Sequence, residues 1–196
     1  QVADVAGGSM HAVIAILAAV IERQQSGKGQ YIDISMTDCV VTMSNLAASA
    51  SLAGNQHQSP ESGYLNGGTF YDYYETQDGR YLSIGSLEPQ FMQGLAQALE
   101  LPILLEKGAS YTAEAHAVVK QAIQNKIKTK SLAEWQMLFA ALDVCVEPVL
   151  RLEEALHSDL AQQRGWVVQV PLKSSSQQTE AQLACPIKFS RSTIRY

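Results

Sequence analysis

Asp4-Val5-Ala6-Gly7-Gly8-Ser9-Met10 places a carboxylate just ahead of a Gly-Gly-Ser turn, and a long apolar helix is predicted to follow from about Met10 to Gln24. The first turn of a helix offers unpaired N–H groups and a partial positive charge, and glycine lets a ligand approach the backbone closely. An anion or a developing oxyanion is therefore favoured there, which makes Gly7 and Gly8 candidates for substrate binding. Asp4 beside such a turn suits a base, a nucleophile or only a helix cap, and these residues alone favour the cap.

Composition and charge are those of an ordinary folded protein. The 196 residues are 46% hydrophobic and 17% charged, enough for one domain with a sizeable core or for two small ones. The net charge of -5, with no basic cluster to offset it, argues against nucleic-acid binding. Cys39, Cys145 and Cys185 lack CxxC spacing, which predicts buried thiols in a reducing, cytoplasmic compartment, without a disulfide frame or a metal site.

The helix predicted at residues 10–24 is apolar on nearly all faces, so we expect it to be buried between partners. Its apolar part is too short to span a bilayer and ends at Glu22 and Arg23, so we expect no membrane partner. No basic region precedes it and no small-residue cleavage pattern follows it, so we expect no signal peptide. The chain begins with Gln1 and nothing precedes the helix to cover it. We therefore expect this sequence to be a fragment of a longer protein.

Two further elements complete the first part of the chain. Gly27 is predicted to end the first helix in a left-handed cap, residues 31–34 alternate like a short strand, and residues 36–52 read as a second helix. Residues 1–52 are therefore predicted to be the helical and strand part of a larger α/β domain. Residues 53–68 are polar and rich in turn formers, which predicts a linker.

After the linker the sequence period changes to two, and Asp78-Gly79 predicts a hairpin. The remaining predicted elements are hairpin strands at 70–76 and 80–85, helices at 88–99, 111–127, 131–142 and 152–157, extended segments at 144–150, 165–170 and 186–190, and a polar loop at 173–182. Pro148 suits an edge strand, and Ser131 and Glu134 form a capping box. The prediction is an α+β fold, with a small domain at 69–150 and a return segment toward the larger domain at 151–196.

Several motifs resemble the family III CoA-transferases (CaiB/BaiF-like), a family that includes the 2-methylacyl-CoA racemases. The family-wide motifs are Asp4-Val5-Ala6-Gly7-Gly8-Ser9, Glu22-Arg23, Ser26-Gly27-Lys28-Gly29-Gln30 and Asp33-Ile34-Ser35-Met36. The motifs similar to the racemase branch are Gly67-Gly68-Thr69-Phe70-Tyr71, Tyr74-Glu75-Thr76, Asp78-Gly79 and Gly85-Ser86-Leu87-Glu88-Pro89-Gln90-Phe91. Residues 143–149 and Arg164-Gly165 are similar as well, so the resemblance extends almost to the end of the chain.

The resemblance implies an enzyme of acyl-CoA thioesters without a metal or an organic cofactor. Racemisation removes the α-proton on one face and returns one on the other, so two acid/base groups must flank the α-carbon while an oxyanion site holds the enolate oxygen. Asp4 matches one of these groups, and the other is a histidine in a Rossmann-like region that this sequence lacks. The resemblance also implies an interlocked homodimer whose active site lies between the large domain of one subunit and the small domain of the other.

Three residues of the small domain match site residues of the racemases. Glu88 matches a glutamate that reaches the absent histidine, where it would orient and charge the imidazole; by itself it is a helix-start carboxylate favoured by the dipole. Tyr71 and Leu87 match walls of the acyl pocket, with hairpin packing as the alternative. Gly68-Thr69-Phe70 is one residue shorter than the usual motif, which puts the assignment of Tyr71 in doubt.

The remaining histidines and methionines carry no assigned chemistry. Each histidine departs from the motif of the absent one and is expected on the surface or on a helix face: His11, His57, His116 and His157. Met10 and Met36 are suited to supply adaptable apolar surface for acyl chains, but they are expected to fill the core.

Three hypotheses remain open at this point. The first is α-proton exchange by Asp4 and the absent histidine, which the Glu88-Pro89-Gln90-Phe91 motif favours. The second is CoA transfer, in which Asp4 attacks the thioester and an acyl-aspartyl anhydride follows. The third is an inactive fragment, because the chain as given lacks one of the two acid/base groups.

Overall fold

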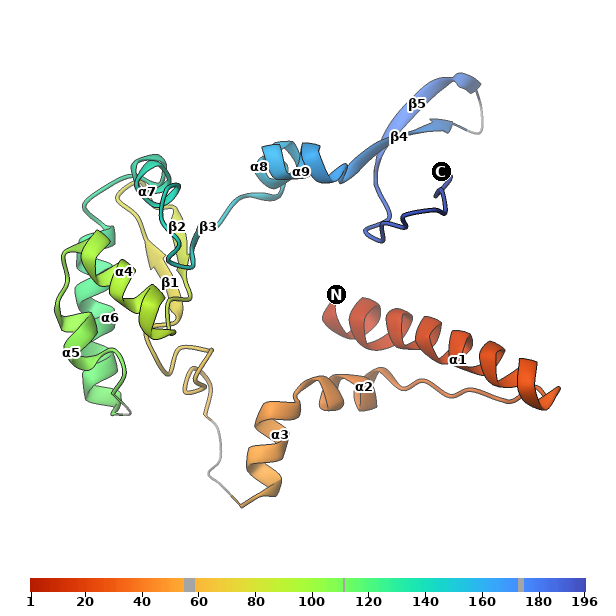
Figure 1. Cartoon of the computed structure of the whole chain (residues 1–196), viewed down its shortest axis with the longest axis horizontal. Coiled ribbons are helices and arrows are strands. Elements are labelled where there is room, and N and C mark those ends of the chain that lie inside the picture. Colours follow the sequence, from red (N-terminus) through yellow and green to blue (C-terminus); the bar gives the residue numbers. More distant parts are fainter. Residues whose placement is uncertain (55–58, 111, 173–174) are drawn as a thin grey trace. The chain divides into compact units, whose positions relative to one another are not determined.

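The computed structural model describes residues 1–54, 59–110, 112–172 and 175–196 (Figure 1). The chain divides into two compact units, Gln1–Gly63 and Tyr64–Tyr196. The fold is a mixture of helices and small antiparallel sheets, as predicted. The point of division falls within the segment predicted as a linker, of which residues 55–58 lie outside the described residues.

The first unit is helical. It contains η1 (Val2–Met10), α1 (His11–Ser26), α2 (Met36–Met43) and α3 (Asn45–Leu52). The helical backbone therefore begins at Val2 and not near Met10, and the predicted Gly-Gly-Ser turn is wrong, because these residues continue the helix with the wider π-helical winding. Gly27 ends α1 in the left-handed region at φ +70°, as predicted, and its N–H donates to the carbonyl of Arg23 at 2.9 Å.

Two other predictions for this unit need correction. Residues 31–34 form no strand, because an extended segment becomes a strand only beside a partner, and the described part of this unit supplies none. The predicted helix at 36–52 is two helices, interrupted at Ser44. The hydroxyl of Ser44 donates to the carbonyl of Val40 at 3.2 Å, a bond back to the preceding turn that bends helices.

The second unit contains a three-stranded antiparallel sheet covered by helices. The strands β1 (Asp72–Glu75), β2 (Tyr81–Ile84) and β3 (Val146–Pro148) lie in the order β1-β2-β3. The hairpin around Asp78-Gly79 pairs Asp72 with Ile84 and Glu75 with Tyr81, and β3 lies at an edge, as Pro148 predicted.

Four helices accompany this sheet: α4 (Pro89–Leu99), α5 (Ile103–Lys107), α6 (Ala113–Ile127) and α7 (Leu132–Phe139). The helix predicted at 111–127 begins at Ala113, after the cap Thr112, and Tyr111 lies outside the described residues. The capping box of Ser131 and Glu134 is present at the start of α7. The short helix α5 was not predicted.

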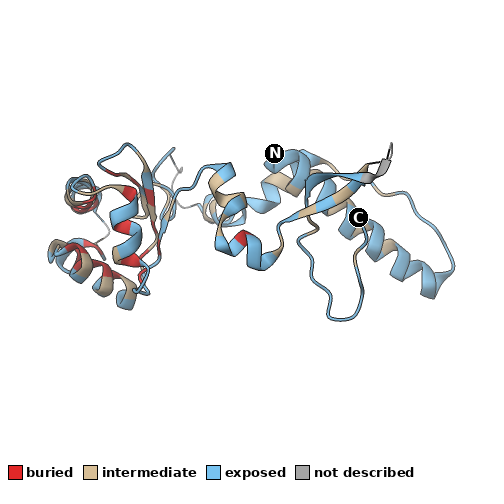
Figure 2. Ribbon diagram, turned by 90° about the horizontal axis from the view of Figure 1, so that it is seen from above, coloured by how far each residue is buried: buried red, intermediate tan, exposed pale blue. Residues whose placement is uncertain are grey.

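The hydrophobic core lies in this body of sheet and helices, where the buried residues gather (Figure 2). Its largest fully buried side chains include Trp135, Tyr74 and Phe70, with Leu82 and Ile84 contributed by the sheet. The hydroxyl of Tyr74 donates to the carbonyl of Phe70 at 2.8 Å, and the indole N–H of Trp135 donates to the carbonyl of Ile127 at 2.7 Å. The polar ends of the large aromatic residues are therefore satisfied inside the core.

The last part of the chain adds two short helices and a separate hairpin: α8 (Leu152–His157), α9 (Asp159–Arg164), β4 (Val167–Leu172) and β5 (Ser175–Leu183). Helix α8 forms as predicted, whereas α9 was not predicted. The polar loop expected at 173–182 is wrong for its described residues from 175 onward, because they pair with β4 as an antiparallel strand. The guanidinium of Arg80 joins α8 to the first sheet through two bonds to the Glu154 carboxylate, at 3.1 and 2.7 Å.

The first helix differs most from its prediction. Helices η1 and α1 run on as one helix over Val2–Ser26, whose length and apolar composition would suffice to cross a membrane. The expectation that it was too short is therefore wrong. The expectation of burial is not met within this chain either, since α1 contains no buried residue and most of its surface is exposed (Figure 2).

Candidate active site

Asp4 lies in the first turn of η1 and is exposed. The cap of this helix is Gln1, so the interpretation of Asp4 as the cap is wrong. Within the described residues the Asp4 carboxylate accepts no hydrogen bond, and its oxygens are therefore open to an incoming molecule. π-helical winding of this kind is rare and recurs at functional sites, which favours a role for this segment beyond packing.

Two side chains brace the backbone around Asp4. The hydroxyl of Ser9 donates to the Asp4 carbonyl at 3.0 Å. The Nδ1 of His11 lies 2.8 Å from the carbonyl of Ala6, and because a carbonyl only accepts, Nδ1 carries the proton in this contact. His11 is thus a helix-face residue that stabilises the π-helical segment.

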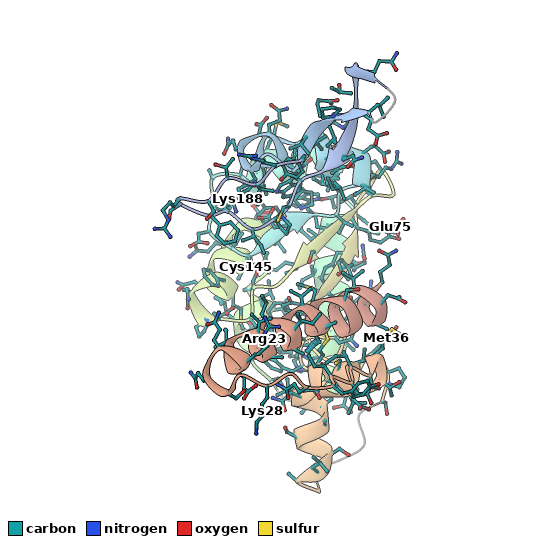
Figure 3. The ribbon with its side chains drawn as sticks, turned by 90° about the vertical axis from the view of Figure 1, so that its right-hand side faces the viewer. Arg23, Lys28, Met36, Glu75, Cys145 and Lys188 are labelled. Carbon is teal, nitrogen blue, oxygen red and sulfur yellow. The ribbon has the colours of Figure 1, made fainter. Side chains whose placement is uncertain are left out.

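Gly7 and Gly8 lie where η1 meets α2. A Cβ at Gly7 would lie 3.2 Å from Cγ2 of Val40, and a Cβ at Gly8 would lie 3.2 Å from Cγ of Met36, the residue labelled in Figure 3. Gly7 is the buried residue of η1. Both glycines therefore allow close packing of α2, and their contact with substrate stays a prediction.

The second group of candidate residues surrounds the loop between β2 and α4, which runs from Gly85 to Glu88. The N–H of Gly85 donates to the carbonyl of Cys145 at 2.9 Å. Ser86 is fully buried, and its hydroxyl donates to the carbonyl of Val144. The loop is therefore held on the segment that leads into β3.

Tyr71 lies against this loop. A Cβ at Gly85 would lie only 3.1 Å from Cε2 of Tyr71, so the glycine leaves room for the ring. The N–H of Tyr71 donates at 3.1 Å to Oγ1 of Thr69, whose own hydroxyl donates at 2.8 Å to the carbonyl of Tyr64. Tyr71 is half-buried, and Thr69 holds its backbone N–H.

Leu87 and Glu88 end the loop. Leu87 is half-buried and packs against the hydrophobic core, so part of its surface serves hairpin packing. Glu88 is the residue before α4 and is exposed, and its side chain makes no capping hydrogen bond. Its carboxylate is therefore not used up as a helix cap.

Cys145 lies beside the same loop and was not singled out as a site residue from the sequence. It is exposed (labelled in Figure 3), which corrects the expectation of buried thiols, and Cys39 and Cys185 are half-buried. Its backbone adopts a left-handed conformation at φ +50°. Loss of hydration at the sulfur, followed by the negative charges of Glu88, Asp143 and Glu147, raises the pKa of the thiol.

A hollow of about 490 Å³ adjoins Cys145, between the end of α7 and β3. Apolar side chains such as Leu82, Phe139 and Val146 line it, together with the carboxylates of Asp143 and Glu147. Val144 and Cys145 thus contact the loop and also line the hollow.

The other histidines that the structure describes, His116 and His157, lie outside both groups. His116 lies on a face of helix α6, as expected, but it is buried, and its Nδ1 has no partner within the described residues. His157 is exposed, and its Nδ1 contacts the carbonyl of Glu153 at 2.7 Å. His57 lies outside the described residues. Among the described residues, no group of three or more His, Cys, Asp and Glu side chains is arranged to hold a metal ion.

The structure therefore brings the candidate residues together in two groups. Asp4, Gly7 and Gly8 share η1 in the first unit, and Tyr71, Leu87 and Glu88 share the loop in the second. That Asp4 meets Glu88 across a cleft stays a prediction. Ser86 and the segment before β3 were missed as site residues, although their motifs were recognised, because a buried serine and a left-handed cysteine carry no signal in sequence.

Comparisons with known proteins show what the chain as a whole is similar to. The chain is 34% identical over 164 residues to the alpha-methylacyl-CoA racemase of Mus musculus, covering 83% of this chain and 43% of that protein. It is 24% identical over 217 aligned positions to the formyl-CoA:oxalate CoA-transferase of Shigella sonnei, covering 94% of this chain and 50% of that protein. The chain thus spans half or less of the length of these relatives.

A solved structure shares the fold. The CAIB/BAIF family protein from Brucella suis superposes with a TM-score of 0.69 at 22% identity, covering 98% of this chain and 50% of that one. The family model of CoA-transferase family III matches residues 1–196. On this evidence, the chain belongs to CoA-transferase family III.

Proposed function

We propose that this chain is part of an enzyme that racemises 2-methylacyl-CoA thioesters by exchange of the α-proton. The observation that carries this choice is the higher identity to an alpha-methylacyl-CoA racemase, 34% compared with 24% for the formyl-CoA:oxalate CoA-transferase. Glu88 supports it as well, because its carboxylate is exposed and makes no capping hydrogen bond, and the racemase reaction needs such a group to orient the histidine.

In the proposed reaction Asp4 is one acid/base group and a histidine outside this sequence is the other. The thioester carbonyl delocalises the negative charge left when the α-proton departs, so the intermediate is an enolate and no metal or organic cofactor takes part. Asp4 suits this role because its carboxylate is exposed and accepts no hydrogen bond within the described residues. Glu88 acts through the histidine, by orienting the ring and stabilising its charged form.

The proposed substrate is an acyl-CoA, with the acyl group against Tyr71 and Leu87. Both residues present half-buried apolar surface beside the Gly85–Glu88 loop, and Tyr71 is held there by Thr69. Asp4 and Glu88 belong to different units of the chain. On the resemblance to the family, we propose that the active enzyme is an interlocked homodimer in which such units of two subunits meet, and that it is cytoplasmic.

A second candidate is CoA transfer between carboxylic acids, which the similarity to the formyl-CoA:oxalate CoA-transferase favours. In that reaction the Asp4 carboxylate attacks the acyl carbonyl and expels the CoA thiolate, which leaves an acyl-aspartyl anhydride. The thiolate then attacks the aspartyl carbonyl, releases the acid and forms an aspartyl-CoA thioester.

Deuterium exchange and mass spectrometry on the complete gene product distinguish the two reactions. Incubation of a 2-methylacyl-CoA in D₂O should place deuterium at the α-carbon, and Asp4→Asn should abolish the exchange on at least one face. Glu22→Gln, a change to another exposed carboxylate of the same long helix, serves as the control. A CoA adduct on Asp4 found by mass spectrometry, without deuterium incorporation, would establish transfer and overturn racemisation.

The 196-residue chain by itself should have little or no activity. Loss of one of two acid/base groups removes roughly 10²–10⁴-fold of the rate that proton transfer contributes. Turnover of a 2-methylacyl-CoA by this chain alone, at a rate comparable with that of the complete gene product, would contradict the proposal.

A further inference from the structure

Ser86 is the point at which the loop carrying Glu88 is joined to the segment before β3. Its side chain is fully buried, although it is polar, and its hydroxyl donates to the carbonyl of Val144. The adjacent Gly85 donates its N–H to the carbonyl of Cys145 at 2.9 Å. Two hydrogen bonds in succession therefore fix the loop on residues 144 and 145.

These bonds continue the sheet beyond the end of its regular pairing. The last pair of the β2–β3 ladder is Ile84 with Val146, and an antiparallel register would next oppose residue 85 to 145 and residue 86 to 144. Cys145 has a left-handed backbone at φ +50°, which ends the extended conformation on that side. The hydroxyl of Ser86 thus bonds a carbonyl where the ladder itself has stopped.

Glu88 lies two residues beyond this junction and starts α4. It is exposed, and its charge is close enough to Cys145 to act on the thiol. The N–H of Leu87 donates to the carbonyl of Gly85 at 2.9 Å, so the chain from the junction to Glu88 is a tight turn with little freedom of its own. Where the junction is fixed, the Glu88 backbone is fixed as well.

We propose that Ser86 is a positioning residue: its hydrogen bond to Val144 sets the place from which Glu88 reaches the proton-exchange site. The proposal rests on the racemase function proposed above. The alternative is that Ser86 only satisfies a buried carbonyl and contributes to stability, with no effect on Glu88.

A first test needs no enzymatic activity and uses the 196-residue chain. The rate of alkylation of Cys145 by iodoacetamide is followed against pH, with the modified peptide resolved by mass spectrometry from those of Cys39 and Cys185. Below the thiol pKa the rate follows the fraction of thiolate. Removing the Glu88 charge by Glu88→Gln should therefore raise the rate at neutral pH by roughly threefold.

The decisive comparison is a double-mutant cycle. If the Ser86 hydrogen bond positions Glu88, the Ser86→Ala variant no longer holds the Glu88 carboxylate near Cys145. In that background Glu88→Gln should change the alkylation rate by less than about 1.5-fold. Ser83→Ala changes a nearby serine in β2 whose side chain makes no hydrogen bond within the described residues, and it should leave the threefold effect intact. An equal effect of Glu88→Gln in all three backgrounds would overturn the proposal.

A second test measures proton exchange in the complete gene product. Ser86→Ala should lower kcat by about tenfold with KM nearly unchanged, and it should alter the pH profile of kcat in the same direction as Glu88→Gln. Ser86→Thr retains the hydroxyl and should restore most of the rate, which separates positioning from a loss of folded protein. Unchanged kcat and pH profile in Ser86→Ala would contradict the proposal.

The two tests distinguish a failure of the racemase function from a failure of the proposed role of Ser86. A wild-type gene product without α-proton exchange would refute the racemase function, while the thiol cycle would still report whether Ser86 positions Glu88. Normal exchange with an additive thiol cycle would refute the role of Ser86 alone.

Discussion

Gly94 lies on the face of α4 that meets the segment before β3. A Cβ at this position would lie 2.7 Å from Cγ1 of Val144, closer than real Cβ contacts permit. Gly94→Ala gains up to about 1 kcal/mol of helix propensity but forces Val144 to move, which costs about 1–3 kcal/mol. We expect a net loss of about 1 kcal/mol in the free energy of unfolding, measured with urea. Gln93→Ala, at the exposed neighbour, should leave stability unchanged or raised, and equal stability of the two variants would contradict the packing argument.

Tyr74 gives the second prediction for a single residue. Burial, and then the negative charge of Asp72, raises the pKa of Tyr74 far above its ordinary value of 10.0. The folded chain therefore keeps a proton that the unfolded chain loses above pH 10. The contribution of this proton to the free energy of unfolding is fully present below pH 10. Above pH 10 the free energy of unfolding falls by up to about 1.4 kcal/mol per pH unit.

Tyr74→Phe isolates this contribution. At pH 8 the variant should lose about 1–2 kcal/mol, because the carbonyl of Phe70 is left without its donor. Between pH 10 and pH 11 the difference from wild type should shrink, since the variant no longer has a buried proton to lose. Tyr73→Phe, on an exposed residue of the same strand, should run parallel to wild type in urea unfolding at both pH values. If the free energy of unfolding of Tyr74→Phe also stays at a constant difference from wild type between pH 10 and pH 11, Tyr74 does not have the raised pKa described here.

Gln124 covers the free edge of strand β1, which the sequence pattern does not show. Strand β1 is the first in the order of its sheet, and the outward backbone groups of Glu75 meet the side-chain amide of Gln124 on α6. The N–H of Glu75 donates to Oε1 at 3.1 Å, and Nε2 donates to the Glu75 carbonyl at 2.9 Å. The amide thus takes the place of a neighbouring strand and covers the edge.

Gln124→Ala should therefore weaken the junction of β1 with α6. Two hydrogen bonds to part-buried backbone groups are lost, and we expect about 1–3 kcal/mol of destabilisation with faster hydrogen exchange at the Glu75 amide. Gln121→Ala is the matched control, since Gln121 is exposed on the same helix and its side chain bonds only to Asn125 among the residues that the structure describes. Equal unfolding midpoints for the two variants would show that the edge is not held in this way.

The elements that the sequence predicted correctly are those specified by neighbouring residues. Asp78-Gly79 fixes the β1–β2 turn, and Ser131 with Glu134 fixes the start of α7, because both act within a few residues. Strand pairing is not local. The alternation at 31–34 could not show that this unit supplies no partner strand among its described residues, and the polar sequence of β5 concealed a partner that exists.

The candidate site divides in the same manner. Asp4, Tyr71, Leu87 and Glu88 were found through motifs, and the structure shows that Asp4 and Glu88 are exposed and that Glu88 makes no capping hydrogen bond. The helical winding through Gly7 and the bond from Ser86 to Val144 were not predicted. The bond from Ser86 joins it to a residue 58 positions away, which a linear pattern does not record. The π-helical winding is braced by local bonds from Ser9 and His11 that no motif indicated.

For the molecule as a whole, the exposed surface of α1 determines whether the chain is monomeric or self-associates in solution. Its large apolar side chains are exposed along the helix, among them Val13, Ile14, Ile16, Leu17, Val20 and Ile21. A contiguous apolar surface of this kind is rare on soluble monomers, because burying it gains about 25 cal/mol per Å². We therefore expect the 196-residue chain to self-associate at micromolar concentrations through α1.

Size-exclusion chromatography with light scattering measures this directly. The substitutions Ile14→Glu and Leu17→Glu together place two charges in the apolar surface and should shift the chain toward monomer. Gln24→Glu adds a charge at the exposed end of the same helix and should leave the association intact. Because Val2–Ser26 is also long enough to cross a membrane, flotation with phosphatidylcholine vesicles is measured in parallel. A monomeric wild-type chain, or a chain that floats with the vesicles and does not associate without them, would show that α1 is not a surface for protein contacts.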